Sequence, residues 1–234
     1  MKESARLYMI PSVLDEDAIQ TIPAYVLEVI KQCQVLFVEN ERTARRYLKA
    51  LEKSIVIDQF EWIAIHKTEE DAVNILRKNI SEGKVIGIIS EAGCPGIADP
   101  GQLLASMAQE MHVPVIPLVG PSSILLALMA SGMNGQQFRF VGYLPIDQPG
   151  RQQKIRELEA DSLKTNCTQI FIETPYRNNQ LIETVLKTCR PTTRLCVAVN
   201  ITGRKERIET KHISDWKKNP PDLQKEPAIF LLLA

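Results

Sequence analysis

Short runs of apolar residues alternate along the chain with longer stretches in which apolar residues recur every three or four positions. The short runs are typical of buried strands, and the longer stretches are typical of helices with one apolar face. The alternation therefore predicts an α/β protein. The predicted strands are residues 6–10, 35–38, 54–60, 85–89, 113–118, 138–144, 169–173, 194–200, 207–211 and 228–233. The predicted helices are residues 22–34, 41–51, 68–81, 102–111, 124–131, 151–160 and 181–188.

The length of the chain predicts more than one domain. It has 234 residues, which is long for one α/β domain and comfortable for two small ones. The strands after residue 136 have the character of a second sheet. We expect an N-terminal α/β domain over residues 1–118 and a C-terminal α/β domain over residues 119–234.

The composition narrows the class of protein. Lys plus Arg and Asp plus Glu both number 28, so any nucleic-acid contact would need a local basic cluster. The 5 cysteines include no CxxC pair, which favours reduced thiols in a cytosol. His66, His112 and His212 show no metal-ligand spacing, so we expect no metal. No apolar run is long enough for a membrane span and no signal peptide is evident, so we expect a cytoplasmic protein without membrane contact.

The segment 90–101 is rich in glycine and proline and follows a predicted buried strand. Open α/β sheets bind their ligands at this end of their strands. Glycine lets the backbone turn sharply and approach a ligand, and proline keeps the path rigid. The segment is neither a P-loop nor a dinucleotide fingerprint. It indicates a preshaped ligand loop, a structural turn being the simpler interpretation, with Asp99 a candidate cap of the next helix.

A second turn, residues 119–123, also connects a predicted strand to a predicted helix. Ser122 or Ser123 can cap that helix, whose first amides would then point toward a bound ligand. Taken alone, this turn is more simply a helix cap.

Together the two loops resemble those of the tetrapyrrole methylase superfamily, and most closely its branch of ribosomal small-subunit RNA 2′-O-methyltransferases. The segment 90–101 differs from that branch's Ser-Asp-Ala-Gly-Thr-Pro-Gly-Ile-Ser-Asp-Pro-Gly only at Glu91, Cys94 and Ala98. The further matches follow in the same order along the chain. They are residues 7–11, Glu39, Arg42, Arg45, residues 131–132, 140–145 and 170–177.

The resemblance implies a homodimer whose subunits each have two α/β domains, with S-adenosylmethionine in the cleft between the domains. It also implies which residues contact that cofactor. They are Ala92, Gly93, Cys94 and Ile97 of the long loop, Ser122 and Ser123 of the turn, Glu173, Ile201, Pro227 and Ala228 of the second domain, and Pro11 at the entrance.

Three segments depart from the pattern of that branch. Residues 11–17 read Pro-Ser-Val-Leu-Asp-Glu-Asp in place of Pro-Thr-Pro-Ile-Gly-Asn-Leu, so a glycine is lost and carboxylates appear. Residues 39–42 read Glu-Asn-Glu-Arg in place of Glu-Asp-Thr-Arg, and residues 199–203 read Val-Asn-Ile-Thr-Gly in place of Arg-Glu-Leu-Thr-Lys. We also expect this protein to lack the C-terminal extension that is common in the RNA enzymes. The cofactor loops are thus kept better than the segments that face the substrate.

Methyl transfer to a hydroxyl needs an acceptor held in line with the S–CH₃ bond and is helped by a general base. Glu39, after a predicted buried strand, is the first candidate for that base or for a residue that orients the substrate. A helix cap or an ion pair with Arg42 is the structural alternative. Glu173 is the second candidate, and a hydrogen bond to the cofactor alone is its alternative role. A basic helix face could hold RNA phosphates, although such a face is usually only solvated. Its residues are Arg42, Arg45, Arg46 and Lys49.

The resemblance and these candidates support a methyltransferase that acts on RNA, at a ribose hydroxyl of a ribosomal-RNA-like substrate. A methylase of a small molecule such as a tetrapyrrole-like metabolite is the alternative that the zero net charge favours. A non-catalytic paralogue that binds the cofactor is the alternative that the altered first loop favours.

Overall fold

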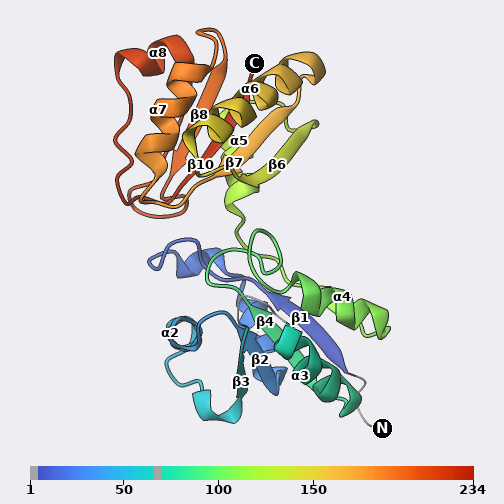
Figure 1. Ribbon diagram of the computed structural model, residues 1–234. Helices are drawn as coiled ribbons and strands as arrows, with labels where there is room; N and C mark the ends of the chain where they lie inside the picture. The colour runs from blue at the N-terminus through green and yellow to red at the C-terminus, as the bar shows by residue number, and fades with distance from the viewer. Residues whose placement is uncertain (1–4, 66–69) are drawn as a thin grey trace. The chain divides into compact units, whose positions relative to one another are not determined.

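The computed structural model describes residues 5–65 and 70–234, which form two compact units, Met1–Ser122 and Ser123–Ala234 (Figure 1). Each unit contains one five-stranded sheet and its own helices. The predicted α/β fold with two sheets is confirmed. The chain passes from one unit to the other after Ser122, whereas the predicted boundary is residue 118.

The first unit is built on a parallel sheet with the strand order β3-β2-β4-β1-β5. Its strands are β1 (Arg6–Ile10), β2 (Val35–Val38), β3 (Glu61–Ala64), β4 (Val85–Ile89) and β5 (Val115–Pro117). Every residue of β2 and β4 is buried, which explains why both are continuous apolar runs. Because the strands are parallel, the loops that follow β1, β2 and β4 all leave from one edge of the sheet.

Helices cover both faces of this sheet. Alternate residues of β2 point into two separate apolar clusters, one with α1 and α2 and the other with α3 and α4. The helices are α1 (Ala24–Gln32), α2 (Glu41–Leu51), α3 (Glu70–Ser81) and α4 (Gln102–Glu110), and short 3₁₀ turns occur at Ile19–Thr21 and Ile57–Gln59.

The second unit has a mixed sheet with the strand order β6-β7-β10-β8-β9, in which only β6 and β7 are parallel neighbours. Helices α6, α7 and α8 share one apolar core with Phe171 and Phe230, whose rings stack at 5.8 Å, while α5 contacts β9 and β10. The strands are β6 (Phe138–Tyr143), β7 (Thr168–Ile172), β8 (Arg194–Val199), β9 (Arg207–His212) and β10 (Ala228–Leu233). The helices are α5 (Ser123–Ser131), α6 (Gln148–Thr165), α7 (Asn178–Thr188) and α8 (Ile213–Lys218).

The predicted strand at residues 54–60 is wrong. Ile55 and Phe60 are buried in the core of the first unit, but the backbone between them makes a 3₁₀ turn, and the strand that pairs with β2 begins at Glu61. Helix α8 was not predicted, because six residues are too few to show a helical period. The predicted helix start at residue 68 lies outside the described residues. Within the described part of the chain, no helix is long and apolar enough to cross a membrane.

Candidate functional site

The loop after β4 has a fixed shape that depends on its glycines. Gly93, Gly96 and Gly101 have φ angles of +70°, +77° and +116°, in the region that favours glycine. Ser90 is buried and its Oγ donates to the carbonyl oxygen of Gly93 at 3.3 Å. The N–H of Gly96 donates to the carbonyl oxygen of Pro100 at 3.1 Å. The motif seen in the sequence is therefore required by the backbone path of this loop.

Two neighbouring loops form hydrogen bonds with the loop after β4. The N–H of Ser12, which follows β1, donates to the carbonyl oxygen of Gly93 at 2.8 Å. The thiol of Cys94 donates to the carbonyl oxygen of Pro121, in the second predicted turn, at 3.5 Å. The two segments that resemble cofactor loops are thus brought together in the first unit.

Pro11 lies directly against the second turn. A Cβ atom added to Gly120 would lie 2.2 Å from Pro11 Cβ, so only glycine fits there. Pro11 is buried, whereas Ala92 is exposed and Ile97 is 54% exposed. Ser122 is half-buried at the end of the unit. The structure therefore gathers Pro11 and the predicted cofactor residues of the loop after β4 at one edge of the first sheet.

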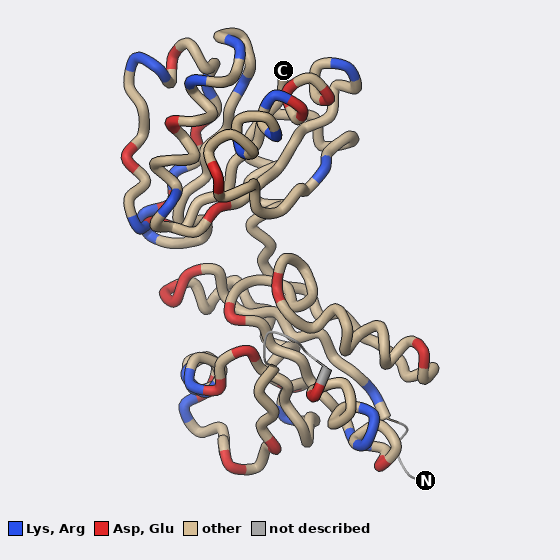
Figure 2. The backbone as a smooth tube through the Cα atoms, viewed as in Figure 1, with Lys and Arg blue, Asp and Glu red and all other residues tan. Residues whose placement is uncertain are grey.

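Glu91 lies close enough to Glu39 and Asp99 at this edge to raise the pKa of both carboxyl groups. Burial, followed by the charges of Glu39 and Glu91, raises the pKa of Asp99 to about 6. Burial and then the charge of Glu91 raise the pKa of Glu39, against a hydrogen bond from the Glu91 backbone that lowers it. Acidic residues recur along these loops in Figure 2. Their negative potential suits a cationic ligand.

The side chain of Glu39 does not cap the helix that follows it. Asn40 caps α2, its side chain accepting from the N–H groups of Arg42 and Thr43 at 3.0 and 3.3 Å. The Oε2 atom of Glu39 is buried and has no hydrogen-bond partner among the described residues. The structural alternative of a helix cap is therefore wrong, and an unpaired buried oxygen remains at the carboxyl end of β2.

Most side chains of the predicted basic face of α2 form ion pairs or hydrogen bonds with other groups of the protein. Arg45 pairs with Glu41 at 2.5 Å and lies over the ring of Trp62. Arg46 pairs with Glu16 at 3.3 Å. Lys49 donates to a backbone carbonyl after α2. Arg42 is exposed in the first turn of α2 and is the member of the face that remains the best candidate to contact a substrate.

In the second unit, the predicted cofactor residues also share one sheet edge. Ile172 pairs with Ile229 and Val199 pairs with Ala228, so the ends of β7 and β8 meet the start of β10. The backbone is joined there by a hydrogen bond of 3.0 Å from the Asn200 N–H to the carbonyl oxygen of Pro227. The predicted residues at this edge are Glu173 and Ile201, both buried, Ala228, which is half-buried, and Pro227, which is exposed.

Glu173 has a side chain with no exposed area. Its Oε1 atom accepts from the N–H of Thr174 at 2.7 Å and from Arg177 Nε and Nη2 at 3.0 and 2.7 Å. Its Oε2 atom is buried without a partner in the part of the chain that the structure describes. This arrangement orients the carboxylate and leaves one oxygen as a hydrogen-bond acceptor for a ligand.

Glu91 and Asp99 are site residues that sequence reasoning missed. Asp99 was considered only as a helix cap, but α4 has Gly101 at its N-cap without a side-chain bond. The available signal was positional: Val38 pairs in register with Ile89, so the residues after β2 and β4 emerge side by side. In the described ranges, no group of three or more His, Cys, Asp and Glu side chains is arranged to hold a metal ion. His66 lies outside those ranges, so the absence of a metal stays a prediction.

Known proteins of one family are similar to this chain in sequence. The family model described as Tetrapyrrole (Corrin/Porphyrin) Methylases matches residues 20–216. The chain is 28% identical over 230 residues to the ribosomal RNA small subunit methyltransferase I of Vibrio cholerae serotype O1, covering 97% of the chain and 76% of that relative. It is 33% identical over 175 residues to the protein of the same name from Micromonospora olivasterospora, covering 74% of the chain and 52% of that relative.

Solved structures show the same fold. The uroporphyrin-III C-methyltransferase from Thermus thermophilus complexed with S-adenosylhomocysteine aligns with a TM-score of 0.58 at 16% identity, covering 97% of both chains. The methyltransferase CobJ aligns with a TM-score of 0.65 at 13% identity, covering 99% of this chain and 94% of that one. At these identities the likeness shows the fold alone.

Proposed function

The chain belongs to the tetrapyrrole (corrin/porphyrin) methylases, and from this premise we propose that it transfers the methyl group of S-adenosylmethionine to a ribose 2′-hydroxyl of RNA, with ribosomal RNA as the substrate. The observation that carries the proposal is the glycine-dependent loop at residues 90–101, bonded to the loops after β1 and β5. Relatives named as ribosomal RNA small subunit methyltransferases support RNA as the acceptor.

The residues present fit S-adenosylmethionine. The carboxylates Glu39, Glu91 and Asp99 favour the positive charge of a sulfonium, and Glu173 Oε2 is a buried acceptor for a ligand hydroxyl or amine. The contacts proposed in the first unit are Pro11, Ala92, Gly93, Cys94, Ile97 and Ser122, and those in the second unit are Ser123, Glu173, Ile201, Pro227 and Ala228. Several of these contacts would be made by the backbone, and such contacts would tolerate Cys94 where the family has threonine.

Glu39 is the proposed general base. Bound S-adenosylmethionine supplies a methyl group that is already activated on sulfur. When the acceptor hydroxyl takes up the methyl group, a carboxylate oxygen of Glu39 would accept the hydroxyl proton. Its raised pKa makes Glu39 a stronger base than an exposed glutamate, and its buried Oε2 has no competing partner among the described residues. Arg42, exposed nearby on α2, would bind a phosphate of the RNA backbone.

A small-molecule acceptor is the second candidate. Carboxylates on the loops at the same sheet edge oppose the approach of phosphate groups. These residues are Asp15, Glu16, Asp17 and Glu91. Such a loop charge suits a neutral or cationic acceptor better than a polyanion.

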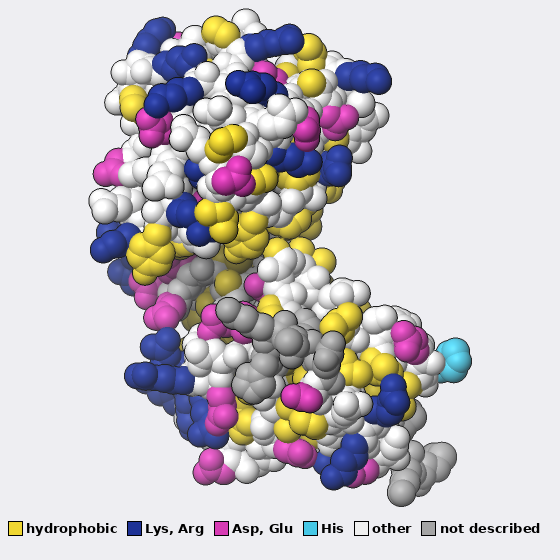
Figure 3. Space-filling view, viewed as in Figure 1, with side chains coloured by type: hydrophobic (Ala, Val, Ile, Leu, Met, Phe, Trp, Pro, Cys, Tyr) yellow, Lys and Arg dark blue, Asp and Glu magenta, His cyan; other side chains and the backbone are white. Residues whose placement is uncertain are grey.

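We also propose that the chain acts as a homodimer in the cytoplasm. Large apolar side chains, yellow in Figure 3, reach the surface of the second unit. Among the exposed ones are Leu125 and Met129 of α5, which are 52% and 78% exposed. Apolar surface of this kind is a common feature of protein interfaces. Light scattering coupled to size-exclusion chromatography distinguishes a dimer from a monomer.

The function is tested by supplying both acceptor classes. The purified chain is incubated with methyl-labelled S-adenosylmethionine and either unmodified small-subunit ribosomal RNA or a uroporphyrinogen whose carboxyl groups are esterified, so that this acceptor is uncharged. Label recovered in a 2′-O-methyl nucleoside by mass spectrometry supports the proposal. Label in the tetrapyrrole alone identifies the second candidate. Saturable binding of S-adenosylhomocysteine without transfer to either acceptor would identify a non-catalytic paralogue.

A further inference from the structure

A cavity of about 230 Å³ lies in the first unit between α2 and the loop that follows β1. One wall is formed by Ser12, Val13, Leu14, Glu16 and Ile19, and α2 forms another. Glu91 and Ala92, at the start of the loop after β4, complete the lining. The cavity therefore adjoins the proposed cofactor loop, and it does so at the segment where this chain departs most from its family.

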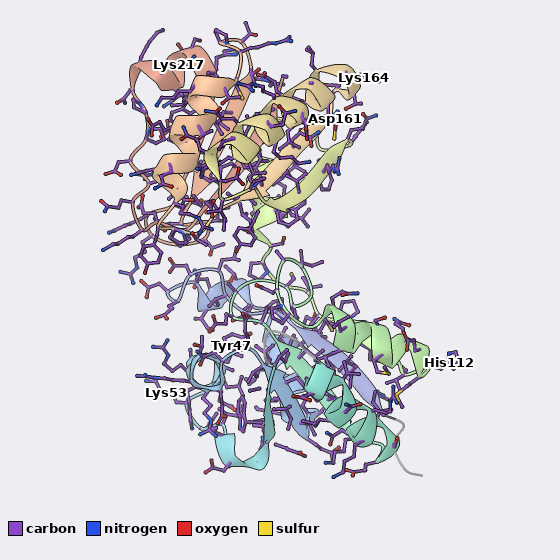
Figure 4. All side chains as sticks on the ribbon, viewed as in Figure 1. Tyr47, Lys53, His112, Asp161, Lys164 and Lys217 are labelled. Atoms are coloured by element: carbon purple, nitrogen blue, oxygen red, sulfur yellow. The ribbon has the colours of Figure 1, made fainter. Side chains whose placement is uncertain are left out.

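The altered segment forms a wall and leaves the cavity open. Asp15 closes a tight turn, in which its Oδ1 accepts from the N–H of Asp17 at 3.0 Å and its carbonyl oxygen accepts from the N–H of Ala18 at 2.9 Å. Ala18 is fully buried and anchors this turn. Tyr47, labelled in Figure 4, is buried on α2 and donates to the carbonyl oxygen of Pro11 at 2.8 Å. Both walls of the cavity are thus fixed by hydrogen bonds.

The lining suits a flat heteroaromatic ring. Val13, Leu14 and Ile19 offer apolar contacts to the faces of such a ring. Arg46 and Glu16, paired at 3.3 Å and largely exposed, line the same cavity. A guanidinium donates to ring nitrogens and carbonyl oxygens, and a carboxylate accepts from amino groups, so this pair complements the edge of a nucleobase.

The size of the cavity suits a single ring system. Its volume of about 230 Å³ exceeds the roughly 150 Å³ of an apolar protein cavity that accepts a benzene ring. That is enough for one nucleobase. The carboxylates of Glu16 and Glu91 on the lining also disfavour a phosphate within it.

We propose that this cavity binds the unstacked base of the nucleotide whose ribose is methylated. The proposal rests on the proposed RNA methylation and adds where the acceptor nucleotide is held. Because Ala92 belongs to both the cavity lining and the cofactor loop, a base in the cavity places its own ribose beside the methyl donor. Enzymes that modify a nucleotide commonly take it out of the base stack in this way.

The test fills the cavity from an exposed position. Ala50 lines the cavity from α2 and is exposed, so Ala50→Trp places an indole in the space with little burden on folding. Ala160→Trp, at an exposed position of α6 in the second unit, is the matched control. Calorimetry measures S-adenosylhomocysteine affinity, RNA methylation gives kcat/KM, and saturation-transfer NMR with 5′-CMP and 5′-AMP reports binding to the protein saturated with S-adenosylhomocysteine.

In Ala50→Trp, we expect S-adenosylhomocysteine affinity to stay within twofold, whereas kcat/KM for RNA falls at least tenfold and nucleotide binding is abolished. In Ala160→Trp, we expect all three quantities to equal those of the unsubstituted protein. An RNA kcat/KM unchanged by Ala50→Trp would overturn the subsite and leave RNA methylation intact. If the unsubstituted protein methylates no RNA, the nucleotide-binding measurement still tests the base-binding role of the cavity. Nucleotide binding that is lost in Ala50→Trp supports this role. Nucleotide binding that is unchanged in Ala50→Trp, or absent from the unsubstituted protein, overturns it. Methylation of the free nucleotides but not of RNA would overturn RNA as the source of the base.

A second variant tests the same proposal if the first variant does not fold correctly. If Ala50→Trp also loses S-adenosylhomocysteine binding, Arg46→Met replaces it, because the exposed Arg46 side chain can be changed without altering the core. It is expected to raise KM for RNA at least tenfold and to weaken nucleotide binding, with cofactor affinity unchanged. Wild-type KM and nucleotide binding in Arg46→Met would overturn the role of this pair in base recognition.

Discussion

Arg177 holds Glu173 through a single carboxylate oxygen. Its Nε and Nη2 atoms donate to Glu173 Oε1 at 3.0 and 2.7 Å. The side chain of Glu173 has no exposed area, and its Oε2 atom has no partner within the described residues. The pair therefore neutralises a buried charge and presents one oxygen at the edge of the second sheet.

Removing Arg177 should destabilise the second unit. Arg177→Met leaves the buried Glu173 carboxylate without its counter-charge, so the melting temperature is expected to fall by several degrees. The double variant Glu173→Gln/Arg177→Met removes the charge as well and should recover part of the loss. Thermal denaturation of both variants measures the difference, and equal melting temperatures would contradict the role assigned to the pair.

Gly93→Ala should weaken cofactor binding. Gly93 has φ +70°, and an added Cβ would lie 3.2 Å from Leu14 Cδ2, so the substitution strains the loop and pushes it against its neighbour. We expect the Kd for S-adenosylhomocysteine to rise at least tenfold in calorimetry. Gly132→Ala is the control, because Gly132 has φ +65° with no atom within 4 Å of the added Cβ. An equal loss of affinity in both variants would show that general destabilisation, and not the loop, is responsible.

Glu39→Gln should slow methyl transfer while keeping the cofactor site. A glutamine cannot take the hydroxyl proton, so kcat is expected to fall about 100-fold, and the acidic limb of the pH–rate profile should disappear. S-adenosylhomocysteine, which lacks the sulfonium charge, should bind with unchanged affinity. Glu41→Gln, at an exposed position on α2, is the control. A kcat for Glu39→Gln within threefold of the unsubstituted enzyme would exclude Glu39 as the base.

Asp99→Asn should stabilise the protein at neutral pH. Burial and the charges of Glu39 and Glu91 raise the pKa of Asp99 from 3.8 to about 6, so the folded state favours the protonated carboxyl. The stability that this group contributes is fully present below pH 3.8 and is lost as the pH rises through 6. Because Asp99 is partly exposed, we expect the variant to gain about 1–2 kcal/mol at pH 7 and little at pH 4.

Chemical denaturation at several pH values between 4 and 8 checks this expectation. Asp71→Asn, at an exposed position of α3, controls for the loss of a surface charge. A gain for Asp99→Asn that does not change with pH would contradict the linkage to its carboxyl group.

The sequence by itself determined most of the elements and the ligand loop. The strand at residues 35–38 was predicted with its observed bounds because a strand buried on both faces must be apolar throughout. The loop at residues 90–101 was identified because its glycines occupy backbone conformations that other residues adopt only at a cost. Both signals are local, because each residue type is favoured by the backbone geometry or the burial at its own position.

Only the tertiary structure shows which apolar segments join the sheet and which side chains meet at the candidate site. Ile55 and Phe60 are buried by packing without joining the sheet, so apolar residues alone did not locate β3. The convergence of Glu39 with Glu91 follows from the pairing of β2 with β4, and this pairing depends on strand order, which no single segment specifies. The raised pKa of Asp99 depends likewise on burial and on charges from distant parts of the chain. Chemistry that arises from such contacts requires the fold, because electrostatic interactions depend on distance in space and on the surrounding dielectric.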